Sequence, residues 1–355
     1  MSKVRVAIIG QGRSGRDIHA NWLLQDKRRF QIVAVADPIP DRRDRAAREI
    51  GCDVYPDHTS LLKRRDIDVI INASPSHLHM AITLDILKSG HHCVTEKPLA
   101  QNPKDVDKMI AAAQKSKVLF TVYQQSRFAP YFQQVRKVID SGVLGEIIQI
   151  NIAFNGFGRR YDWQTLQDHM AGNLLNTGPH PLDQALQLFG PGQPHVTCFM
   201  DRAVTSGDAE DHVLLILRGK HRPLIEIEVS SVCPFPTPIY KIYATQGGLE
   251  GSMTELKWKY FIPKDNPKPK LQREPLNTPE GTPAYPAENL RWIEKSWTVP
   301  PAQANLFTAI SRAFYTALYN SITKGTPLAI KLEEVRRQAW VIDQCQKQNP
   351  HIYKK

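Results

Sequence analysis

The feature that most constrains the fold is a glycine-rich loop that directly follows a short apolar run near the N-terminus. Residues 4–9 (Val-Arg-Val-Ala-Ile-Ile) favour a strand, and the loop from Gly10 to Gly15 has the pattern GxGxxG before helical spacing begins. The first glycine allows the tight turn, the second lets the backbone approach a pyrophosphate, and the third allows close packing of helix on strand. The helix start offers unpaired N–H groups to phosphates. The loop therefore predicts a Rossmann-type dinucleotide-binding unit.

An acidic residue stands where such a unit needs one. Residues 30–36 form a second β-rich run that ends at Asp37, about 20 residues beyond the glycine loop. A carboxylate there accepts hydrogen bonds from the adenosine ribose hydroxyls, and its charge repels the 2′-phosphate of NADP. NAD is the expected cofactor. NADP is the alternative, because Arg42 and Arg43 lie just downstream, where they could contact a 2′-phosphate.

Five β-rich runs alternate with segments of helical spacing in the first third of the chain. The runs cover residues 4–9, 30–36, 69–73, 92–95 and 118–122, and the helical segments include 81–87 and 106–113. This alternation is typical of a parallel, doubly wound sheet of the α/β class. We therefore predict an NAD(P)-binding Rossmann domain over residues 1–123.

After Tyr123 the pattern changes to strands without intervening helices. A helix at 129–141 and a turn at 142–145 lead into strand-like runs at 146–154, 195–204, 212–218, 224–232 and 239–245, with Gly219 and Gly247-Gly248 as turn signals. The proline- and lysine-rich segment 263–290 is expected to be a long surface loop, and helices at 303–324 and about 332–347 close the chain. The pattern predicts a substrate-binding and oligomerisation domain over residues 124–355, of α+β type on an open, mainly antiparallel sheet.

Composition excludes several classes of protein. The chain is 41% hydrophobic and 23% charged, as in ordinary globular proteins, and no run approaches the roughly 18 apolar residues that span a bilayer. The start of the chain lacks the apolar region of a signal peptide, so we expect a cytoplasmic protein without a membrane partner. The five cysteines are scattered and never form a CxxC pair, and no other close ligand set appears. We therefore expect no metal.

The net charge of +11 raises the question of nucleic-acid binding. The densest basic clusters, at residues 41–45 and 63–66, are interleaved with aspartates, which is typical of solvated helix faces. We therefore expect no nucleic-acid partner. The same positive charge could instead attract an anionic cofactor or substrate.

A lysine follows the fourth β-rich run in the turn Glu96-Lys97-Pro98. Ligands of open α/β sheets bind beyond the carboxyl ends of the strands, so Lys97 is expected beside the nicotinamide. Its ammonium could hold a substrate hydroxyl and lower the pKa of a neighbouring base. The alternative is a surface lysine in a turn.

A second set of polar residues lies in the second domain. Asn176, His180 and Asp183 are spaced so that one helix would present all three on one face. A histidine with a near-neutral pKa suits removal of a hydroxyl proton as hydride leaves the adjoining carbon. Upstream, Arg159 and Trp163 could hold substrate hydroxyls or stack on a sugar ring, or belong to a packed loop with solvated arginines. For Arg127 the same two interpretations, substrate binding or a structural role, stay open.

Motifs along most of the chain resemble the Gfo/Idh/MocA family, which includes glucose–fructose oxidoreductases and inositol dehydrogenases. They are the glycine loop, Ser74-Pro75-Ser76-His77-Leu78-His79, residues 90–98 ending in Glu96-Lys97-Pro98, Gln125-Ser126-Arg127-Phe128-Ala129-Pro130, residues 142–147 and residues 172–183. The resemblance implies a substrate cleft between the domains, Lys97 as the catalytic lysine and His180 as the general acid/base. Asp183 would contact substrate hydroxyls or orient the histidine. The family usually has Asp where this chain has Asn176.

The resemblance also implies an open C-terminal sheet used for oligomer contacts, so we expect a homo-oligomer, a dimer or tetramer. The cofactor-binding residues expected are Gly10, Gly12, Arg13, Ser14, Gly15, Asp37, Ser74, Pro75, His79, Glu96, Lys97 and Gln125. The substrate-binding residues expected are Lys97, Arg127, Arg159, Trp163, Asn176, His180 and Asp183.

These expectations indicate an NAD(H)-dependent oxidoreductase that transfers a hydride at a hydroxyl-bearing carbon of a sugar, sugar derivative or cyclitol. Two alternatives stay open at this point. One is a redox-neutral enzyme, an epimerase or glycosidase, that keeps NAD tightly bound. The other is a non-catalytic sensor of nucleotides or sugars.

Overall fold

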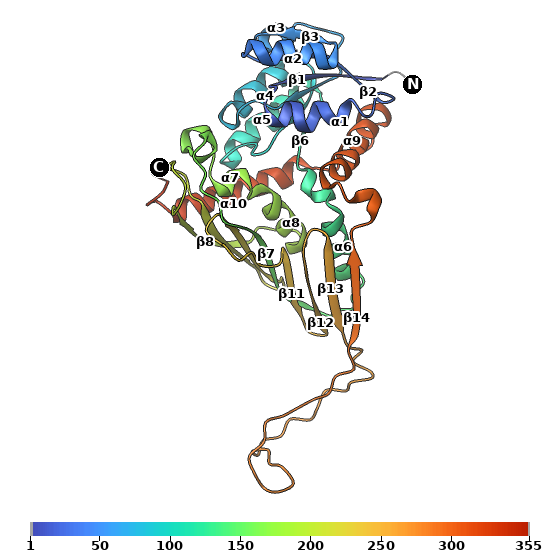
Figure 1. Cartoon of the computed structure of the whole chain (residues 1–355), viewed down its shortest axis with the longest axis vertical. Helices are drawn as coiled ribbons and strands as arrows, with labels where there is room; N and C mark the ends of the chain where they lie inside the picture. Colours follow the sequence, from blue (N-terminus) through green and yellow to red (C-terminus); the bar gives the residue numbers. More distant parts are fainter. Residues whose placement is uncertain (1–2, 354–355) are drawn as a thin grey trace.

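A computed structural model describes residues 3–353 as two α/β halves, each built on one sheet (Figure 1). Residues 1, 2, 354 and 355, which belong to the two predicted domains, lie outside the described range. Within that range, no helix has both the length and the apolar character needed to cross a membrane.

The first half contains a six-stranded parallel sheet in the order β3-β2-β1-β4-β5-β6. Its strands are β1 (Val4–Ile9), β2 (Phe30–Ala36), β3 (Asp53–Tyr55), β4 (Val69–Asn72), β5 (His92–Thr95) and β6 (Phe120–Val122). Its helices are η1 (Arg13–Ala20), α1 (Asn21–Leu23), α2 (Pro40–Ile50), α3 (His58–Leu61), η2 (Ser76–Leu78), α4 (His79–Lys88) and α5 (Pro103–Ser116). The predicted doubly wound sheet is confirmed. Only the short edge strand β3 carries no periodic signal.

The helix after the glycine loop has an unusual form. Residues Arg13–Ala20 form a π-helix, η1, before one short α-helical turn, α1. Such wide turns are rare and recur at functional sites, because the extra residue changes where the side chains point. His19 lies in the last turn of η1, and its side chain points into the interior, where it is fully buried.

The second half contains an eight-stranded sheet in the order β14-β13-β12-β11-β7-β10-β9-β8, antiparallel except between β7 and β10. Its strands are β7 (Ile147–Asn155), β8 (His195–Asp201), β9 (His212–Arg218), β10 (Leu224–Ser230), β11 (Tyr240–Ala244), β12 (Gly247–Gly251), β13 (Glu255–Tyr260) and β14 (Ile293–Thr298). The α+β class with a mainly antiparallel sheet is confirmed.

The reading of Gly247 and Gly248 as a turn is wrong, because both lie in β12. A Cβ on Gly247 would lie 2.1 Å from the carbonyl oxygen of Lys259 on β13, so glycine allows the two strands to approach. With three glycines among its five residues, the strand buries only Leu249, which is too little for hydrophobic periodicity to show.

The remaining helices surround the second sheet or link it to the first half. They are η3 (Gln125–Phe128), α6 (Pro130–Asp140), η4 (Trp163–Thr165), η5 (Gln167–His169), α7 (Asn173–Asn176), α8 (Pro179–Phe189), η6 (Pro301–Gln303), α9 (Leu306–Lys324) and α10 (Leu332–Gln348). Between β13 and β14, the segment that contains residues 263–290 projects far from the body as a long exposed arm (Figure 1). The expected surface loop is therefore present.

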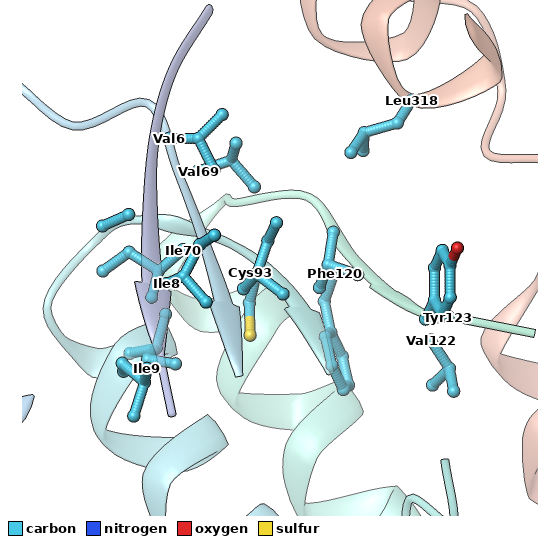
Figure 2. Close-up of a cluster of buried hydrophobic side chains, with 14 of the residues drawn as sticks. Val6, Ile8, Ile9, Val69, Ile70, Cys93, Phe120, Val122, Tyr123 and Leu318 are labelled. Carbon is cyan, nitrogen blue, oxygen red and sulfur yellow. The ribbon is translucent and has the colours of Figure 1, made fainter. Parts of the chain in front are cut away.

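The core of the first half draws on the last third of the chain. Figure 2 shows Val6, Ile8 and Ile9 of β1 against neighbouring strands, with Leu318 of α9 facing the same cluster. Phe314 and Tyr315 of α9 also belong to this core. Burying each such side chain contributes roughly 1.5–3 kcal/mol. Helix α9, near the end of the sequence, thus stabilises the first sheet. The predicted domain boundary after residue 123 stays a prediction.

Candidate active site

A cleft of about 1170 Å³ runs along the carboxyl ends of the first sheet and is closed by the second half. Of the predicted site residues, it brings together Gly10, Gly12, Arg13, Ser14, Asp37, Ser74, Pro75, His79, Glu96, Lys97, Gln125, Trp163, Asn176 and His180. Gly15, Arg127, Arg159 and Asp183 do not line it.

The three loop glycines have three different steric environments. A Cβ on Gly10 would lie 2.4 Å from the carbonyl oxygen of Ala73, and one on Gly15 would lie 1.8 Å from that of Gly10. Both positions therefore admit only glycine within the protein itself. A Cβ on Gly12 would meet only the flexible end of Arg42, at 3.7 Å. The absence of a side chain at Gly12 thus leaves space on the cleft side, beside the N-terminus of η1, which has no side-chain cap.

Asp37 lies at the carboxyl end of β2 and is only 2% exposed. Its carboxylate accepts hydrogen bonds from the backbone N–H of Gln11 at 2.6 Å and of Ile39 at 2.9 Å. These bonds fix the carboxylate at the wall of the cleft. Arg42 Nη1 lies 3.6 Å from it, whereas Arg43 donates to the carbonyls of residues 37 and 38. Of the two arginines, therefore, only Arg42 lines the cleft.

Lys97 reaches across the cleft to the second half. Its Nζ donates a 2.7 Å hydrogen bond to the backbone carbonyl of Asn176, the last residue of α7. Burial lowers the pKa of the Lys97 ammonium, Glu96 opposes this shift, and the positive charges of Arg13 and Arg160 add to it. Arg13, Lys97 and Arg160 thus bring three cationic side chains to one cleft.

Glu96 is buried directly beneath Lys97. Its Oε2 accepts from the Lys97 backbone N–H at 3.1 Å, and its Oε1 lies 3.1 Å from His19 Nε2. His19 Nδ1 in turn lies 2.6 Å from the hydroxyl of Tyr315 on α9. Burial by itself would raise the pKa of Glu96, but His19, followed by Lys97 and His79, lowers it to about 2.

His180 faces Lys97 from the start of α8. Burial, and next the positive charge of Lys97, lowers the pKa of its imidazole to about 3, so the ring is neutral at physiological pH. Its Nδ1 is buried and has no hydrogen-bond partner among the described residues. An unpartnered buried nitrogen is costly, which marks this atom as one that a ligand group would satisfy.

The expected single helix carrying Asn176, His180 and Asp183 does not form. Helix α7 ends at Asn176 and α8 begins at Pro179. A Cβ on Gly178, between them, would lie 2.3 Å from the carbonyl of Leu174, so the chain turns tightly there. The break points Asn176 and His180 into the cleft, whereas Asp183 faces the interior.

Asp183 and Arg127 bind each other. Their two hydrogen bonds measure 3.0 Å and 2.5 Å, and Arg127 also pairs with Glu334 at 2.5 Å. Both members of the pair are buried. The structure thus places them in a buried ion pair that does not line the cleft, and their roles towards a substrate or His180 stay predictions.

The neighbouring arginines of the 159–163 segment have opposite environments. Arg159 is exposed outside the cleft, whereas Arg160 lines it and is held by Asp162 through bonds of 3.0 Å and 2.7 Å. Trp163, 42% exposed, also lines the cleft. Across the opening, His77 of η2 contacts His169 of η5 ring to ring, with centroids 4.7 Å apart.

The remaining predicted cofactor residues form the middle of the cleft. Ser74 and Pro75 follow β4, and buried His79 contacts the carbonyl oxygens of Ser74 at 2.9 Å and Pro98 at 2.7 Å. His79 therefore joins the loop after β4 to the loop that carries Lys97. Gln125 Oε1 is buried without a partner among the described residues.

Two family models match the chain. Residues 4–124 match the NAD-binding Rossmann fold of the GFO_IDH_MocA oxidoreductase family, and residues 132–250 match the GFO/IDH/MocA C-terminal domain. The chain belongs to the GFO/IDH/MocA family. This GFO/IDH/MocA protein is therefore an oxidoreductase with an NAD-binding domain, which confirms the family, enzyme class and cofactor expected from the sequence.

Named relatives of this GFO/IDH/MocA protein differ in activity. A 2,7-anhydro-N-acetylneuraminate hydratase of Mediterraneibacter gnavus is 26% identical over 262 residues, which are 72% of this chain and 69% of the relative. The scyllo-inositol 2-dehydrogenase (NADP(+)) of Bacillus subtilis is 24% identical over 348 residues, 93% of this chain and 89% of the relative. The WlbA dehydrogenase from Bordetella pertussis, crystallised with NADH and UDP-GlcNAcA, shares the fold, with a TM-score of 0.76, 19% identity and coverage of 99% and 97%.

The residues present fit NAD. A pyrophosphate would fit the space left at Gly12 beside the uncapped start of η1. An adenosine ribose would fit beside the fixed carboxylate of Asp37. The unpartnered Oε1 of Gln125 lies in the same cleft and can accept from an amide. Among residues 3–353, no group of three or more His, Cys, Asp and Glu side chains is arranged to hold a metal ion.

Sequence reasoning missed His19, His169 and Arg160 as cleft-supporting or cleft-lining residues. Arg160 differs from Arg159 only by one position in an irregular loop, so no periodicity separates them. His19 would face elsewhere in a regular α-helix, and the π-helical turn that buries it leaves no sequence pattern.

Proposed function

We propose that the protein transfers a hydride between NAD(H) and a hydroxyl-bearing carbon of a sugar, sugar derivative or cyclitol. The observation that carries the proposal is the pairing of Lys97 and His180 at the nicotinamide end of one cleft, where the charge of Lys97 lowers the pKa of His180. A hydrogen-bond donor and a neutral base that share one site suit the removal of a hydroxyl proton.

The roles divide as follows in the oxidising direction. Lys97 Nζ leaves the carbonyl of Asn176 and donates to the substrate oxygen, where it stabilises the developing negative charge. His180, neutral above about pH 3, takes the hydroxyl proton. NAD⁺ held at Gly12 and Asp37 would supply the acceptor for the hydride that leaves the substrate carbon. The reducing direction returns the proton from His180.

Substrate recognition falls to the residues that surround this pair. We assign Arg160, Trp163 and Asn176 to the substrate, because they line the cleft from the second half. Trp163 offers an apolar face to a sugar ring. Asp162 and Gln164 hold Nε and Nη2 of Arg160, so that, within residues 3–353, its Nη1 is left for a hydroxyl or an anionic group. The relative named as a scyllo-inositol 2-dehydrogenase supports a cyclitol or sugar as substrate.

A redox-neutral reaction is the second candidate. The relative named as a hydratase favours it, because that name describes no net oxidation. The same Lys97 and His180 would then oxidise one carbon transiently, and the hydride would return before product release. NAD(H) that stays bound through purification, with no net change in NADH absorbance during turnover, would identify this mode.

We also propose that the outer face of the second sheet forms a homo-oligomer contact, in a dimer or tetramer. Phe199 of β8 is 58% exposed and Tyr243 of β11 is 42% exposed, and both project from strands whose alternate residues are buried. Analytical ultracentrifugation tests this contact, and a monomer at micromolar concentration would contradict it.

A panel of cyclitols, aldoses, sugar acids and glycosides, incubated with NAD or NADP, tests the main proposal through NADH or NADPH formation. Turnover of one member, lost in Lys97→Ala and His180→Ala, is the expected result. Tight sugar binding without reaction anywhere in the panel would instead favour the sensor.

A further inference from the structure

The buried chain behind Lys97 is not used by the proposed chemistry. It runs from the Tyr315 hydroxyl on α9 through His19 on η1 to the carboxylate of Glu96, with contacts of 2.6 Å and 3.1 Å. His19 is 0% exposed and Glu96 is 4% exposed. Placing a carboxylate and an imidazole there is costly unless they stabilise something specific.

We propose that His19 is a positioning residue for Lys97, and that it acts through Glu96, whose carboxylate it orients and keeps charged beneath the catalytic lysine. This inference rests on the proposed function of Lys97. It also connects the cofactor loop to the catalytic turn, because His19 belongs to the same π-helix whose first residue follows Gly12.

Chemistry fixes the direction of the hydrogen bond between His19 and Glu96. An ionised carboxylate only accepts, so His19 Nε2 carries the hydrogen that points at Glu96 Oε1. Burial raises the pKa of Tyr315 far above its usual range, so its hydroxyl stays protonated, and it lies 2.6 Å from His19 Nδ1. Tyr315 thereby holds the imidazole in the orientation that serves Glu96.

The remaining oxygen of Glu96 fixes the start of the catalytic turn. Oε2 accepts from the Lys97 backbone N–H at 3.1 Å, so both carboxylate oxygens are engaged. The groups that interact electrostatically with Glu96 come from every surrounding element: His19, His79, Lys97, Tyr123, His180 and Tyr315. Burial keeps both tyrosines neutral, and His79 and His180 have lowered pKa values. Lys97 is thus the lysine whose charge interacts with Glu96, after the interaction of Glu96 with His19.

The consequence for Lys97 has a definite sign. Burial lowers the pKa of Lys97 and the negative charge of Glu96 raises it, so an ionised Glu96 keeps the ammonium protonated. Without His19, burial raises the pKa of Glu96 from about 2, and Glu96 becomes neutral as the pH falls. Lys97 then loses its counter-charge in acid but keeps it at alkaline pH.

Competitive reductive methylation of Lys97, measured by mass spectrometry against surface lysines, tests this without any substrate. In His19→Leu, the labelling of Lys97 relative to wild type should exceed one at about pH 5 and approach one at about pH 8. His19→Gln, which keeps a donor nitrogen, should restore wild-type labelling. His19→Asn, polar and too short to reach Glu96, replaces His19→Leu should that variant not fold.

His91 provides the matched control. It is also buried, and both ring nitrogens have partners: Nδ1 lies 2.7 Å from the Ser89 hydroxyl and Nε2 lies 2.9 Å from the Arg64 carbonyl oxygen. His91 lies just before the start of β5, whereas Glu96 and Lys97 follow its end. His91→Leu should leave the labelling ratio at one. A ratio of one throughout for His19→Leu, or an equal rise in His91→Leu, overturns the inference.

Turnover gives the second readout. In His19→Leu, the ratio of kcat to wild type should fall to about one tenth at acidic pH, where Glu96 is neutral, and approach one at about pH 8, while the Kd for NADH stays within about threefold. A kcat ratio that does not change with pH overturns the positioning role. A wild type that transfers no hydride refutes the proposed function instead, and the labelling result then still decides whether His19 controls Lys97.

Discussion

Lys97 Nζ donates a 2.7 Å hydrogen bond to the backbone carbonyl oxygen of Asn176, so the two halves of the protein meet at the lysine proposed to hold the substrate. The bond uses the backbone, so it does not depend on which side chain stands at residue 176. The family's usual aspartate would add a charge to the cleft without changing this contact.

Asn176→Asp should therefore raise the pKa of His180 above its value of about 3, because a nearby negative charge favours the imidazolium. We expect the acid limb of kcat/KM in the oxidising direction to move to higher pH, since His180 must be neutral to accept a proton. Histidine NMR titration, assigned with His180→Gln, measures the shift directly. A pKa that stays at about 3 or falls would contradict this electrostatic reading of the site.

Cofactor choice should depend on Asp37. Asp37→Ser removes the charge that repels a 2′-phosphate and leaves Arg42 beside the same position. The ratio of NADP to NAD efficiency should rise about tenfold or more, equivalent to about 1.4 kcal/mol. Adding Arg42→Gln should reverse the gain. Initial rates with both cofactors provide the measurement. An unchanged ratio of NADP to NAD efficiency would show that Asp37 does not determine cofactor choice.

Arg160 and Arg159 form a natural test pair. Arg160→Gln removes a cleft cation and should raise KM for the preferred substrate about tenfold or more, equivalent to about 1.4 kcal/mol of lost binding, with a smaller effect on NADH binding. Arg159→Gln carries the same charge change outside the cleft and should leave KM within about twofold. Equal effects in the two variants would show that net charge, and not contact with the substrate, is responsible.

The Arg127–Asp183 pair should matter for stability more than for substrate choice. Arg127→Met leaves the buried carboxylate of Asp183 without its partner and should cost about 3–5 kcal/mol of unfolding free energy. Arg336→Met, which removes an exposed pair with Asp107, should leave the unfolding midpoint nearly unchanged. Urea unfolding of both variants decides the point. A large change in substrate preference with little loss of stability would instead show that Arg127 acts in substrate binding.

Much of the fold, and the gathering of most predicted site residues in one cleft, could be predicted from sequence because they follow local rules. Strands β1, β2 and β5 coincide with apolar runs, and Gly10 and Asp37 sit at strand ends where a dinucleotide site requires them. Strand β12 was hidden because its glycines bury no side chain. His19 was hidden because a π-helix changes its direction, and the Arg127–Asp183 pair joins residues 56 positions apart.

The direct test of the central claim is single-turnover hydride transfer with the substrate found in the panel, compared among wild type, Lys97→Ala and His180→Ala. We predict that each variant binds NADH within about threefold of wild type and transfers hydride about 10²–10⁴ times more slowly. Wild-type rates of transfer in either variant, with the cofactor bound normally, would contradict the assignment of Lys97 and His180 to the chemical step.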